Sequence, residues 1–237
     1  MKLWQGDFIS QMQSMQGEAE LFDLIQREAR ELGFEHCAYG LKLPLNMTKP
    51  KVVMFNNYSL RWQQRYVDEN YLAIDPIVNH GGRSTTPVVW SDDEISGDRA
   101  FWEEARSHGL QYGWAQASTN TQGIRGLLTL TRSNDPLSES ELKKVGYRLV
   151  WLTQVAHQCM GDLISFRMLP ETTIFLSSRE KDVLRWTAEG KTAGEAARIM
   201  NLSERTVNFH IANAMQKLNC VNKTVAAVRA AVLGILN

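Results

Sequence analysis

The 237-residue sequence is poor in cysteine and has no long apolar run, and each shortage argues against a class of protein. Three widely separated cysteines, Cys37, Cys159 and Cys220, argue against a disulfide framework and for a reducing compartment. No stretch approaches the roughly 18 continuous apolar residues of a membrane span, and the N-terminus lacks the apolar run of a signal peptide. We therefore expect a cytoplasmic protein without a membrane segment.

Net charge is also lacking, because 26 basic residues balance 26 acidic ones. The distribution is nevertheless uneven. From Ser177 onward nine basic side chains stand against five acidic ones, so residues 1–176 carry the acidic excess. A mildly basic C-terminal part beside an acidic body is consistent with contact to a polyanion at one end of the chain.

Signatures of catalysis and of metal binding are missing as well. The sequence has no GxSxG, P-loop or GxGxxG motif and no clustered His/Cys spacing. We therefore expect neither an enzyme nor a metal site or cofactor. A phosphorylation-switched response regulator would need an aspartate after an early strand in a repeating βα pattern, and the acidic run Asp92-Asp93-Glu94 lacks that context.

Helical and strand-like segments alternate up to about residue 166. Helical spacing marks 18–33, 59–70, 75–80, a segment ending near Gly109, and a long helix from Ser138 to about Phe166. Strand-like runs fall at 35–43, 52–55, 86–90, 112–118 and 126–131, the last two joined by a turn at 120–123. This pattern predicts an α+β fold whose N-terminal domain is an α-β-α sandwich around an antiparallel sheet.

The pattern changes at residues 167–176, where we place a linker between a domain at 1–166 and a second at 177–237. The second domain shows four helical segments and no credible strand. A short helix, a tight turn and a longer polar-faced helix form a helix-turn-helix arrangement. The residues expected to cap the four helices are Ser177, Thr192, Ser203 and Asn222.

The third of these helices presents side chains suited to DNA. Amides pair with adenine edges, apolar groups touch the thymine methyl, and basic groups neutralise phosphates. A solvated helix face is the alternative for one polar helix alone, but four capped helices in this order favour DNA binding. The outward residues are Arg205, Thr206, Asn208, Phe209, Ala212, Asn213, Gln216 and Lys217.

The second domain resembles the DNA-binding domain of LuxR-type quorum-sensing regulators. The resemblance rests on the stretches 177–192 and 203–210, in which Glu180, Leu184 and Gly190 stand where that family has its characteristic Glu, Leu and Gly.

This resemblance implies that Glu180 braces the helix-turn-helix internally and that a homodimer binds double-stranded DNA at an inverted repeat. It further implies that Lys191 and Thr192 contact phosphate, whereas Asn208 and Ala212 face bases.

A second group of candidate functional residues lies in the first domain. Tyr58, Trp62 and Tyr66 recur every four positions, which places them on one helix face. Core packing is the alternative interpretation for any single aromatic residue. Asp75 among them is harder to explain, because an unpaired buried carboxylate is costly. We expect it to need a donor, which the amide of a ligand would supply.

This arrangement is similar to the acyl-homoserine-lactone-binding domain of the LuxR family, so the resemblance covers nearly the whole chain. It implies that Trp62 donates its indole N–H to the lactone carbonyl and that Asp75 accepts the ligand amide N–H. Tyr58 and Thr129 would donate hydroxyls to the acyl carbonyl. The implied lining of ring and chain is Tyr66, Trp90, Phe101 and Ala105.

Ala38 would lie beside the acyl chain and leave no polar side chain there to recognise a substituent on the ligand's third carbon. Binding of the lactone would stabilise the domain, whose long helix at 138–166 would form a dimer. The alternative is an orphan receptor of the same fold that responds to a different small molecule.

Overall fold

The structure is a computed structural model that describes residues 4–43, 51–91, 99–120, 123–168 and 175–236. The chain divides into two compact units. One comprises Met1–Asn120 and Ile124–Ile164, and the other contains Ser165–Asn237. The linker predicted at 167–176 lies mostly outside the described residues.

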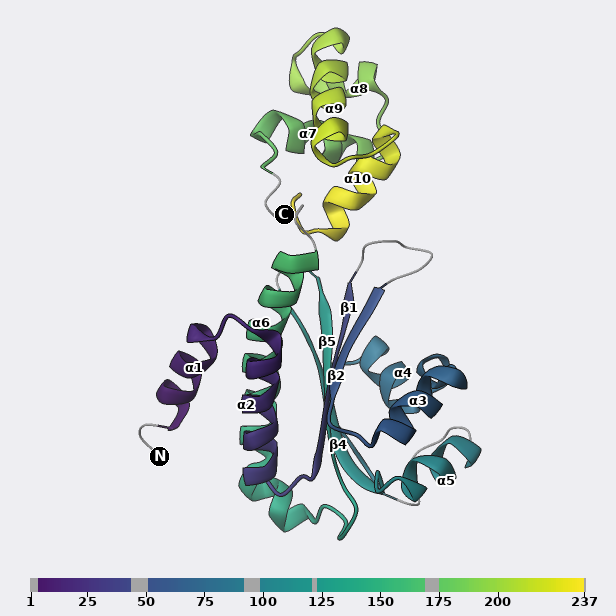
Figure 1. Ribbon diagram of the computed structural model, residues 1–237. Helices are drawn as coiled ribbons and strands as arrows, with labels where there is room; N and C mark the ends of the chain where they lie inside the picture. The colour runs from purple at the N-terminus through teal and green to yellow at the C-terminus, as the bar shows by residue number, and fades with distance from the viewer. Residues whose placement is uncertain (1–3, 44–50, 92–98, 121–122, 169–174, 237) are drawn as a thin grey trace. The chain divides into compact units, whose positions relative to one another are not determined.

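The first unit is an α-β-α sandwich around one antiparallel sheet, as the sequence predicts (Figure 1). Its helices are α1 (Trp4–Ser14), α2 (Glu18–Glu31), α3 (Leu60–Asp68), a 3-10 turn η1 (Tyr71–Ala73), α4 (Pro76–Arg83), α5 (Arg99–Ser107) and α6 (Glu139–Met168). Its strands are β1 (His36–Leu43), β2 (Lys51–Asn56), β3 (Val88–Trp90), β4 (Tyr112–Thr119) and β5 (Arg125–Arg132), in the order β2-β1-β5-β4-β3.

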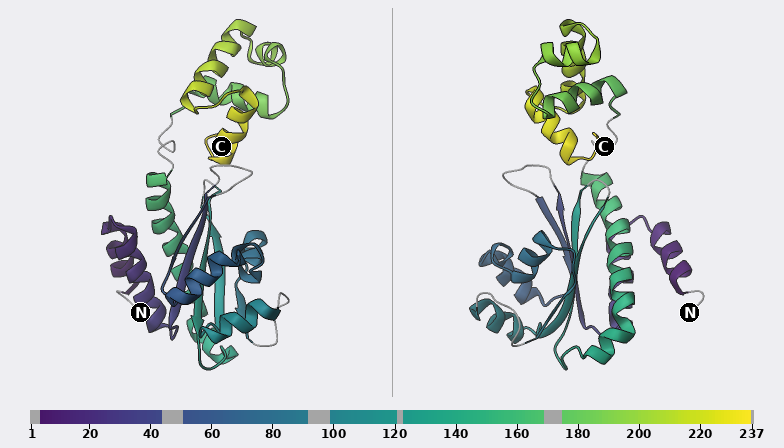
Figure 2. Two further views of the ribbon diagram at one scale, coloured as in Figure 1. Left: turned by 45° about the vertical axis from the view of Figure 1, so that its right-hand side comes forward. Right: turned by 180° about the vertical axis from the view of Figure 1, so that it is seen from behind.

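The two faces of the sheet are covered by different helices. Helices α2 and α6 cover one face, and α3, α4 and α5 cover the other, as the edge-on view and the two further views agree (Figures 1 and 2). No helix among the described residues is long and apolar enough to cross a membrane.

Large side chains fill the α2/α6 face. Tyr39 and Leu41 of β1 and Leu128 and Leu130 of β5 are fully buried there. Tyr39 also donates its hydroxyl to Nδ1 of the buried His157 on α6 at 2.8 Å, while His157 Nε2 lies 3.1 Å from the carbonyl of Ile124. A neutral imidazole that donates through Nε2 satisfies both contacts, and the bonds fasten β1 and the start of β5 to α6.

Small side chains dominate the α3–α5 face. Cross-strand partners share a face, so the register places Ala115, Thr129 and Ala38 in one row and Ala117, Leu127 and Gly40 in the next. The residues between them are mostly larger and point to α6, so helices α3, α4 and α5 face the smaller side chains of the sheet. The site described below occupies this side.

The second unit consists of four capped helices: α7 (Ser178–Ala188), α8 (Ala193–Met200), α9 (Glu204–Lys217) and α10 (Lys223–Val232). Ser177 with Glu180 and Thr192 with Glu195 form complete capping boxes, and Ser203 caps α9 while Asn222 caps α10, as predicted. The buried side of α9 carries Val207, Ile211, Ala214 and Leu218.

One helix was not predicted from the sequence. Helix α1 precedes the first predicted helix and buries Phe8 and Met12, and the Phe8 ring packs on Trp151 of α6 at a centroid distance of 5.3 Å. Trp4, Phe8, Ile9 and Met12 recur at helical spacing in this segment, a signal that could have been recognised.

Candidate functional site: a ligand cage and a DNA-reading helix

An aromatic cluster surrounds Trp62 between α3, η1 and α5. The Trp62 indole is 2% exposed and lies within 6.0 Å, centroid to centroid, of four other rings. Those rings belong to Tyr66, Tyr71, Phe101 and His108. Within the described chain Trp62 hydrogen-bonds through its backbone N–H, to Ser59 Oγ, so its indole N–H remains available to a ligand.

The nine residues predicted to bind the ligand come together on this side of the sheet. Ala105 and the partly buried Tyr58 belong to the cluster around Trp62. Trp90 packs with Ile77 and Ala115 in an adjoining cluster. Thr129 stands between Ala38 and Ala115 in the register. Asp75 joins the cluster through Tyr66.

The expectation that Asp75 lacks a protein donor is wrong. Asp75 is the N-cap of α4, and its Oδ1 accepts the backbone N–H groups of Ile77 at 2.8 Å and Val78 at 3.3 Å. Its Oδ2 accepts the hydroxyl of Tyr66 at 2.7 Å. A carboxylate offers about four acceptor positions, so Oδ2 retains one for a further donor. Burial alone therefore does not require a ligand, but the group can still hold one.

Burial is the main cause of the pKa shifts of Asp75 and Tyr66. Desolvation raises the pKa of Asp75, and the hydrogen bonds from Tyr66, Ile77 and Val78 oppose the shift. Burial also raises the pKa of Tyr66, and the neighbouring Asp75 adds to it, so the Tyr66 hydroxyl stays protonated and keeps donating. A donor supplied by a ligand would favour the ionised form of Asp75 further.

Two buried polar atoms beside this site, the indole nitrogens of Trp90 and Trp102, have no hydrogen-bond partner in the described part of the chain. Buried polar atoms are normally paired, so a group of unpaired ones on one side of the sheet is typical of a place where a polar guest or water binds.

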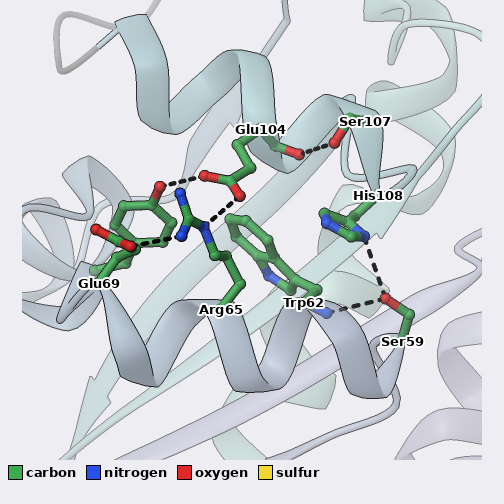
Figure 3. Close-up of polar contacts among 8 residues, drawn as sticks. Ser59, Trp62, Arg65, Glu69, Glu104, Ser107 and His108 are labelled. Carbon is green, nitrogen blue, oxygen red and sulfur yellow. Dashed lines mark hydrogen bonds and ion pairs between the residues drawn. The ribbon is translucent and has the colours of Figure 1, made fainter.

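Polar contacts join α3, η1 and α5 around the aromatic cluster of Trp62, which we call the cage. Arg65 of α3 reaches Oε1 of Glu104 on α5 at 2.6 Å and Oε1 of Glu69 at 2.5 Å (Figure 3). Tyr71 donates its hydroxyl to the other oxygen of Glu104. The His108 ring packs at a tilt against the Trp62 indole, and its Nδ1 lies 3.4 Å from Ser59 Oγ (Figure 3). These contacts hold α3 against α5 and fix one side of Trp62.

Helix α9 of the second unit presents the expected polar surface. Arg205, Asn208, Phe209 and Ala212 are exposed, and Phe209 retains 59% of its surface although its ring contacts His210. Thr206 and Asn213 are partly buried beside them. Lys191 is exposed just before α8.

Two predicted DNA contacts also have structural roles. Thr192 caps α8, and its hydroxyl donates to Glu195 at 2.8 Å. Lys217 Nζ donates to the buried Glu180 at 2.8 Å and to the carbonyl of Phe175 at 3.3 Å. Burial acts to raise the pKa of Glu180, but the bonds from Lys217 and the Ser177 N–H outweigh it and leave the pKa below its ordinary value. Glu180 thus ties α7 to α9, as expected of a brace.

The described residues contain no group of three or more His, Cys, Asp or Glu side chains that could hold a metal ion. The acidic run at 92–94 lies outside the part of the chain that the structure describes.

Comparison with known proteins identifies both units. Residues 17–160 match the family described as the autoinducer binding domain, and residues 175–230 match the bacterial regulatory proteins of the luxR family. The chain belongs to the LuxR family of transcription regulators. It contains an autoinducer-binding domain and a helix-turn-helix DNA-binding domain.

Relatives within the LuxR family match the chain from end to end. The transcriptional activator protein AnoR of Acinetobacter nosocomialis is 46% identical over 100% of both chains. The quorum-sensing regulator RhlR of Pseudomonas aeruginosa is 36% identical over 99% of this chain and 97% of its own. A crystal structure of Escherichia coli SdiA superposes with a TM-score of 0.81 at 34% identity, covering 99% of this chain and 98% of SdiA. These relatives are regulators by name, in agreement with the expectation that the chain is not an enzyme.

The sequence analysis did not predict two parts of the site. One is the row of small residues on β4, which forms the floor of the site, and the other is the set of contacts among Arg65, Glu104 and Tyr71. Gly113, Ala115 and Ala117 alternate along β4 with Trp114 and Gln116, and this period-two pattern of small residues was a readable signal. The Arg65–Glu104–Tyr71 contacts join residues up to 39 positions apart and had no local signal.

Proposed function

We propose that the protein is an N-acyl-homoserine lactone receptor that acts in the cytoplasm and regulates transcription by binding DNA as a homodimer. The observation that carries the proposal is the pairing of two complementary groups on one side of the sheet. The indole N–H of Trp62 is a donor without a protein acceptor in the described chain, and Asp75 Oδ2 is an acceptor with a remaining position. A lactone ring joined to an amide offers the matching acceptor and donor.

In the proposed complex the two carbonyls and the amide N–H of the ligand each have a partner of suitable chemistry. Trp62 donates to the lactone carbonyl, and Asp75 accepts the amide N–H. The hydroxyls of Tyr58 and Thr129 donate to the acyl carbonyl, and Thr129 lies in the row of small residues that forms the floor. Tyr66, Trp90, Phe101 and Ala105 line the ring and chain, with Ala38 beside the chain.

Ligand binding would raise the stability of the folded first unit. A ligand at about a hundred times its dissociation constant adds about 2.7 kcal/mol to the stability of the state that binds it. Marginally stable domains have about 5–15 kcal/mol in total, so occupancy of the cage changes the folded population strongly.

Two exposed apolar surfaces support the proposed dimer. Tyr147 and Val150 on α6 are 54% and 37% exposed. In the second unit Val225 and Val228 on α10 are 43% and 38% exposed, and Val221 just before it is 89% exposed. We propose that α6 pairs the first units and α10 pairs the second units. A two-fold dimer of this kind would bind an inverted repeat with half-sites about one helical turn apart.

In the proposed DNA complex α9 lies in the major groove. Asn208, Ala212 and Phe209 face bases, and Lys191, Thr192 and Arg205 contact phosphates, with Thr206, Asn213 and Lys217 at the margin. The mildly basic charge of this part of the chain supports the assignment.

A second candidate keeps the fold and changes the ligand. One solved structure of SdiA, with a TM-score of 0.81 and 32% identity, is titled as a complex with octanoyl-rac-glycerol, an acyl compound that has no lactone. An aromatic cage can bind many small molecules.

The test is a melting experiment on the full-length protein with homoserine lactones of different chain length and with the corresponding monoacylglycerols. The lactone proposal predicts a rise in melting temperature with at least one lactone that exceeds the rise with the glycerol ester of the same chain. A larger rise with the glycerol ester supports the second candidate. No rise with any lactone overturns the proposal.

A further inference from the structure

One carboxylate on α5 joins three elements at the outer edge of the cage. Oε1 of Glu104 accepts the Nε–H of Arg65 on α3 at 2.6 Å, and its Oε2 accepts the hydroxyl of Tyr71 in η1 (Figure 3). Glu69, one turn after Arg65, holds the guanidinium from its other side at 2.5 Å. Glu104 therefore links α5 to α3 and to η1 at once, and the ligand contacts proposed above give it no role.

These contacts lie between solvent and the interior of the cage. The side chains of Arg65 and Glu104 are 46% and 26% exposed, whereas Trp62 and Phe101 are only 2% and 4% exposed. Tyr71 connects the two zones, because its hydroxyl reaches Glu104 while its ring lies 5.6 Å from the Trp62 ring and 5.2 Å from the Phe101 ring. Since Trp62 is almost fully buried, a ligand reaches its indole N–H only after one of the enclosing elements has moved.

The helices that enclose the cage are not fastened in the same way. Helix α4 packs directly on β5, since a Cβ on Gly81 would lie 2.9 Å from Leu127, and Arg125 of β5 donates to two backbone carbonyls of α4. Within the described residues α5 is joined to α3 and η1 by side chains rather than by backbone hydrogen bonds. Its polar contacts with them come from Glu104 and His108. The boundary between α3 and α5 can thus open without the loss of a backbone hydrogen bond.

We propose that Glu104 is a latch that holds α5 closed over Trp62 and thereby sets how fast the ligand enters and leaves the cage. This inference rests on the proposed lactone function and deepens it. In the closed form Glu104 is bound to Arg65 and Tyr71. In the open form both contacts are broken, α5 moves away from α3, and the Trp62 indole is accessible. Because the ion pair is partly exposed it is weak, so the latch opens reversibly.

A latch has a kinetic signature that distinguishes it from a ligand contact. The ligand passes the same opening in both directions, so a weaker latch raises the association and dissociation rate constants by the same factor. The dissociation constant, which is their ratio, then stays the same. Loss of a ligand contact instead raises the dissociation constant, and a general loss of stability lowers the melting temperature without speeding association.

The experiment measures both rate constants by stopped-flow binding and by displacement, with the full-length protein and with Glu104→Gln. The probe is octanoyl-homoserine lactone, replaced by the tightest binder of the melting panel where another chain length binds better. The variant keeps the shape of the side chain and removes the charge that attracts Arg65. We expect both rate constants to rise at least about threefold, less than the full value of a charge-assisted hydrogen bond because of solvent exposure. The dissociation constant should change less than about twofold.

Arg65→Met tests the same contact from the other helix and should give the same pattern. Melting temperatures of the unliganded variants check that each one folds, and Arg65→Met carries the test where Glu104→Gln does not fold. Raising the ionic strength should also speed both steps in the unaltered protein and have a smaller effect in the two variants, since salt screens the partly exposed ion pair.

Glu103→Gln is the matched control. Glu103 is the neighbouring carboxylate on α5, and it pairs at 2.8 Å with Arg99 of the same helix, where its side chain is 58% exposed. This variant also removes one charge and one ion pair, but that pair joins α5 to no other element. Both rate constants and their salt dependence should therefore match those of the unaltered protein.

The outcomes separate this inference from the function on which it rests. If the unaltered protein binds lactones and neither Glu104→Gln nor Arg65→Met speeds association, the inference is overturned and the lactone function stands. The same conclusion follows if Glu103→Gln speeds both steps as much as Glu104→Gln does. If the unaltered protein binds no lactone of any chain length, both are overturned.

Discussion

The hydroxyl of Tyr66 donates a hydrogen bond of 2.7 Å to Oδ2 of Asp75, and Tyr66 lies on α3 one helical turn after Trp62. The helix that carries the proposed donor to the lactone therefore also orients the proposed acceptor of the ligand amide. The backbone N–H groups of Ile77 and Val78 hold the other oxygen of Asp75. The carboxylate is thus positioned before a ligand arrives, which reduces the ordering cost of binding.

Asp75→Asn should reduce ligand affinity by at least about tenfold, because a charge-assisted hydrogen bond is worth about 1.5–3 kcal/mol. The asparagine carbonyl would cap α4, since asparagine is a good N-cap, and its NH2 group, a donor, would replace Oδ2 beside the ligand N–H. Trp62→Phe should cause a similar loss by removing the indole donor. Dose-response measurements of reporter expression test both, and unchanged curves for the two variants would remove the lactone interpretation.

Ligand binding should weaken as the pH falls through the raised pKa of Asp75. Burial raises the pKa of Asp75 in the unliganded protein, and a ligand N–H would favour the ionised form and lower that pKa again. The affinity gained from this contact is therefore full above the raised pKa and is lost as the pH falls through it. Titrations from neutral pH downward should show this dependence in the unaltered protein and a flat profile in Asp75→Asn. An affinity that increases on acidification contradicts the assignment.

Tyr39→Phe should destabilise the first unit by about 1–3 kcal/mol, because it leaves Nδ1 of the buried His157 without its donor. Burial lowers the pKa of His157 in the folded state, so the contribution of this histidine to stability is full above the unfolded value near 6.5 and is lost as the pH falls from there through the lower pKa of the folded state. Denaturant unfolding measures the first effect, and its pH dependence, which should flatten in His157→Gln, measures the second. A Tyr39→Phe protein as stable as the original would contradict the role of this hydrogen bond.

The two kinds of DNA contact predict different phenotypes. Asn208→Ala should change the preferred base at one position of each half-site, whereas Lys191→Ala should weaken all sequences alike and lower the salt dependence by about one unit. Selection of binding sites from a random library distinguishes them. An unaltered sequence preference for Asn208→Ala would count against the base-facing role.

Lys217→Met should lower the stability of the second unit by about 1–3 kcal/mol, since it leaves the charge of the buried Glu180 unpaired. The value lies below that of a fully buried pair, because the Lys217 side chain is 44% exposed. Thermal unfolding measures this loss. The salt dependence of DNA binding separates the two roles of this residue: a decrease of about one unit shows that Lys217 also contacts phosphate, and an unchanged value shows that it acts through Glu180 alone.

Elements with local signals were predictable from the sequence. The caps of α7, α8, α9 and α10 use Ser, Thr and Asn at the positions where the chain leaves its extended conformation. The strands and their antiparallel arrangement followed from alternation and turns, and the aromatic residues gathered because they repeat at helical spacing on α3.

The rest depends on contacts between distant segments. In the sequence Lys217 cannot be distinguished from any other exposed basic residue of α9, because its partner Glu180 lies 37 positions earlier. The Asp75 cap of α4, with Pro76 at the first helical position, was a local signal that could have been recognised.

The account depends most on Asp75 accepting the amide N–H of an acyl-homoserine lactone. The direct measurement is a calorimetric cycle with octanoyl-homoserine lactone and its N-methyl amide analogue, each titrated into the full-length protein and into Asp75→Asn. We predict that N-methylation costs the unaltered protein at least about tenfold more affinity than it costs the variant, because the variant has already lost that contact. An equal loss in both proteins would contradict the account.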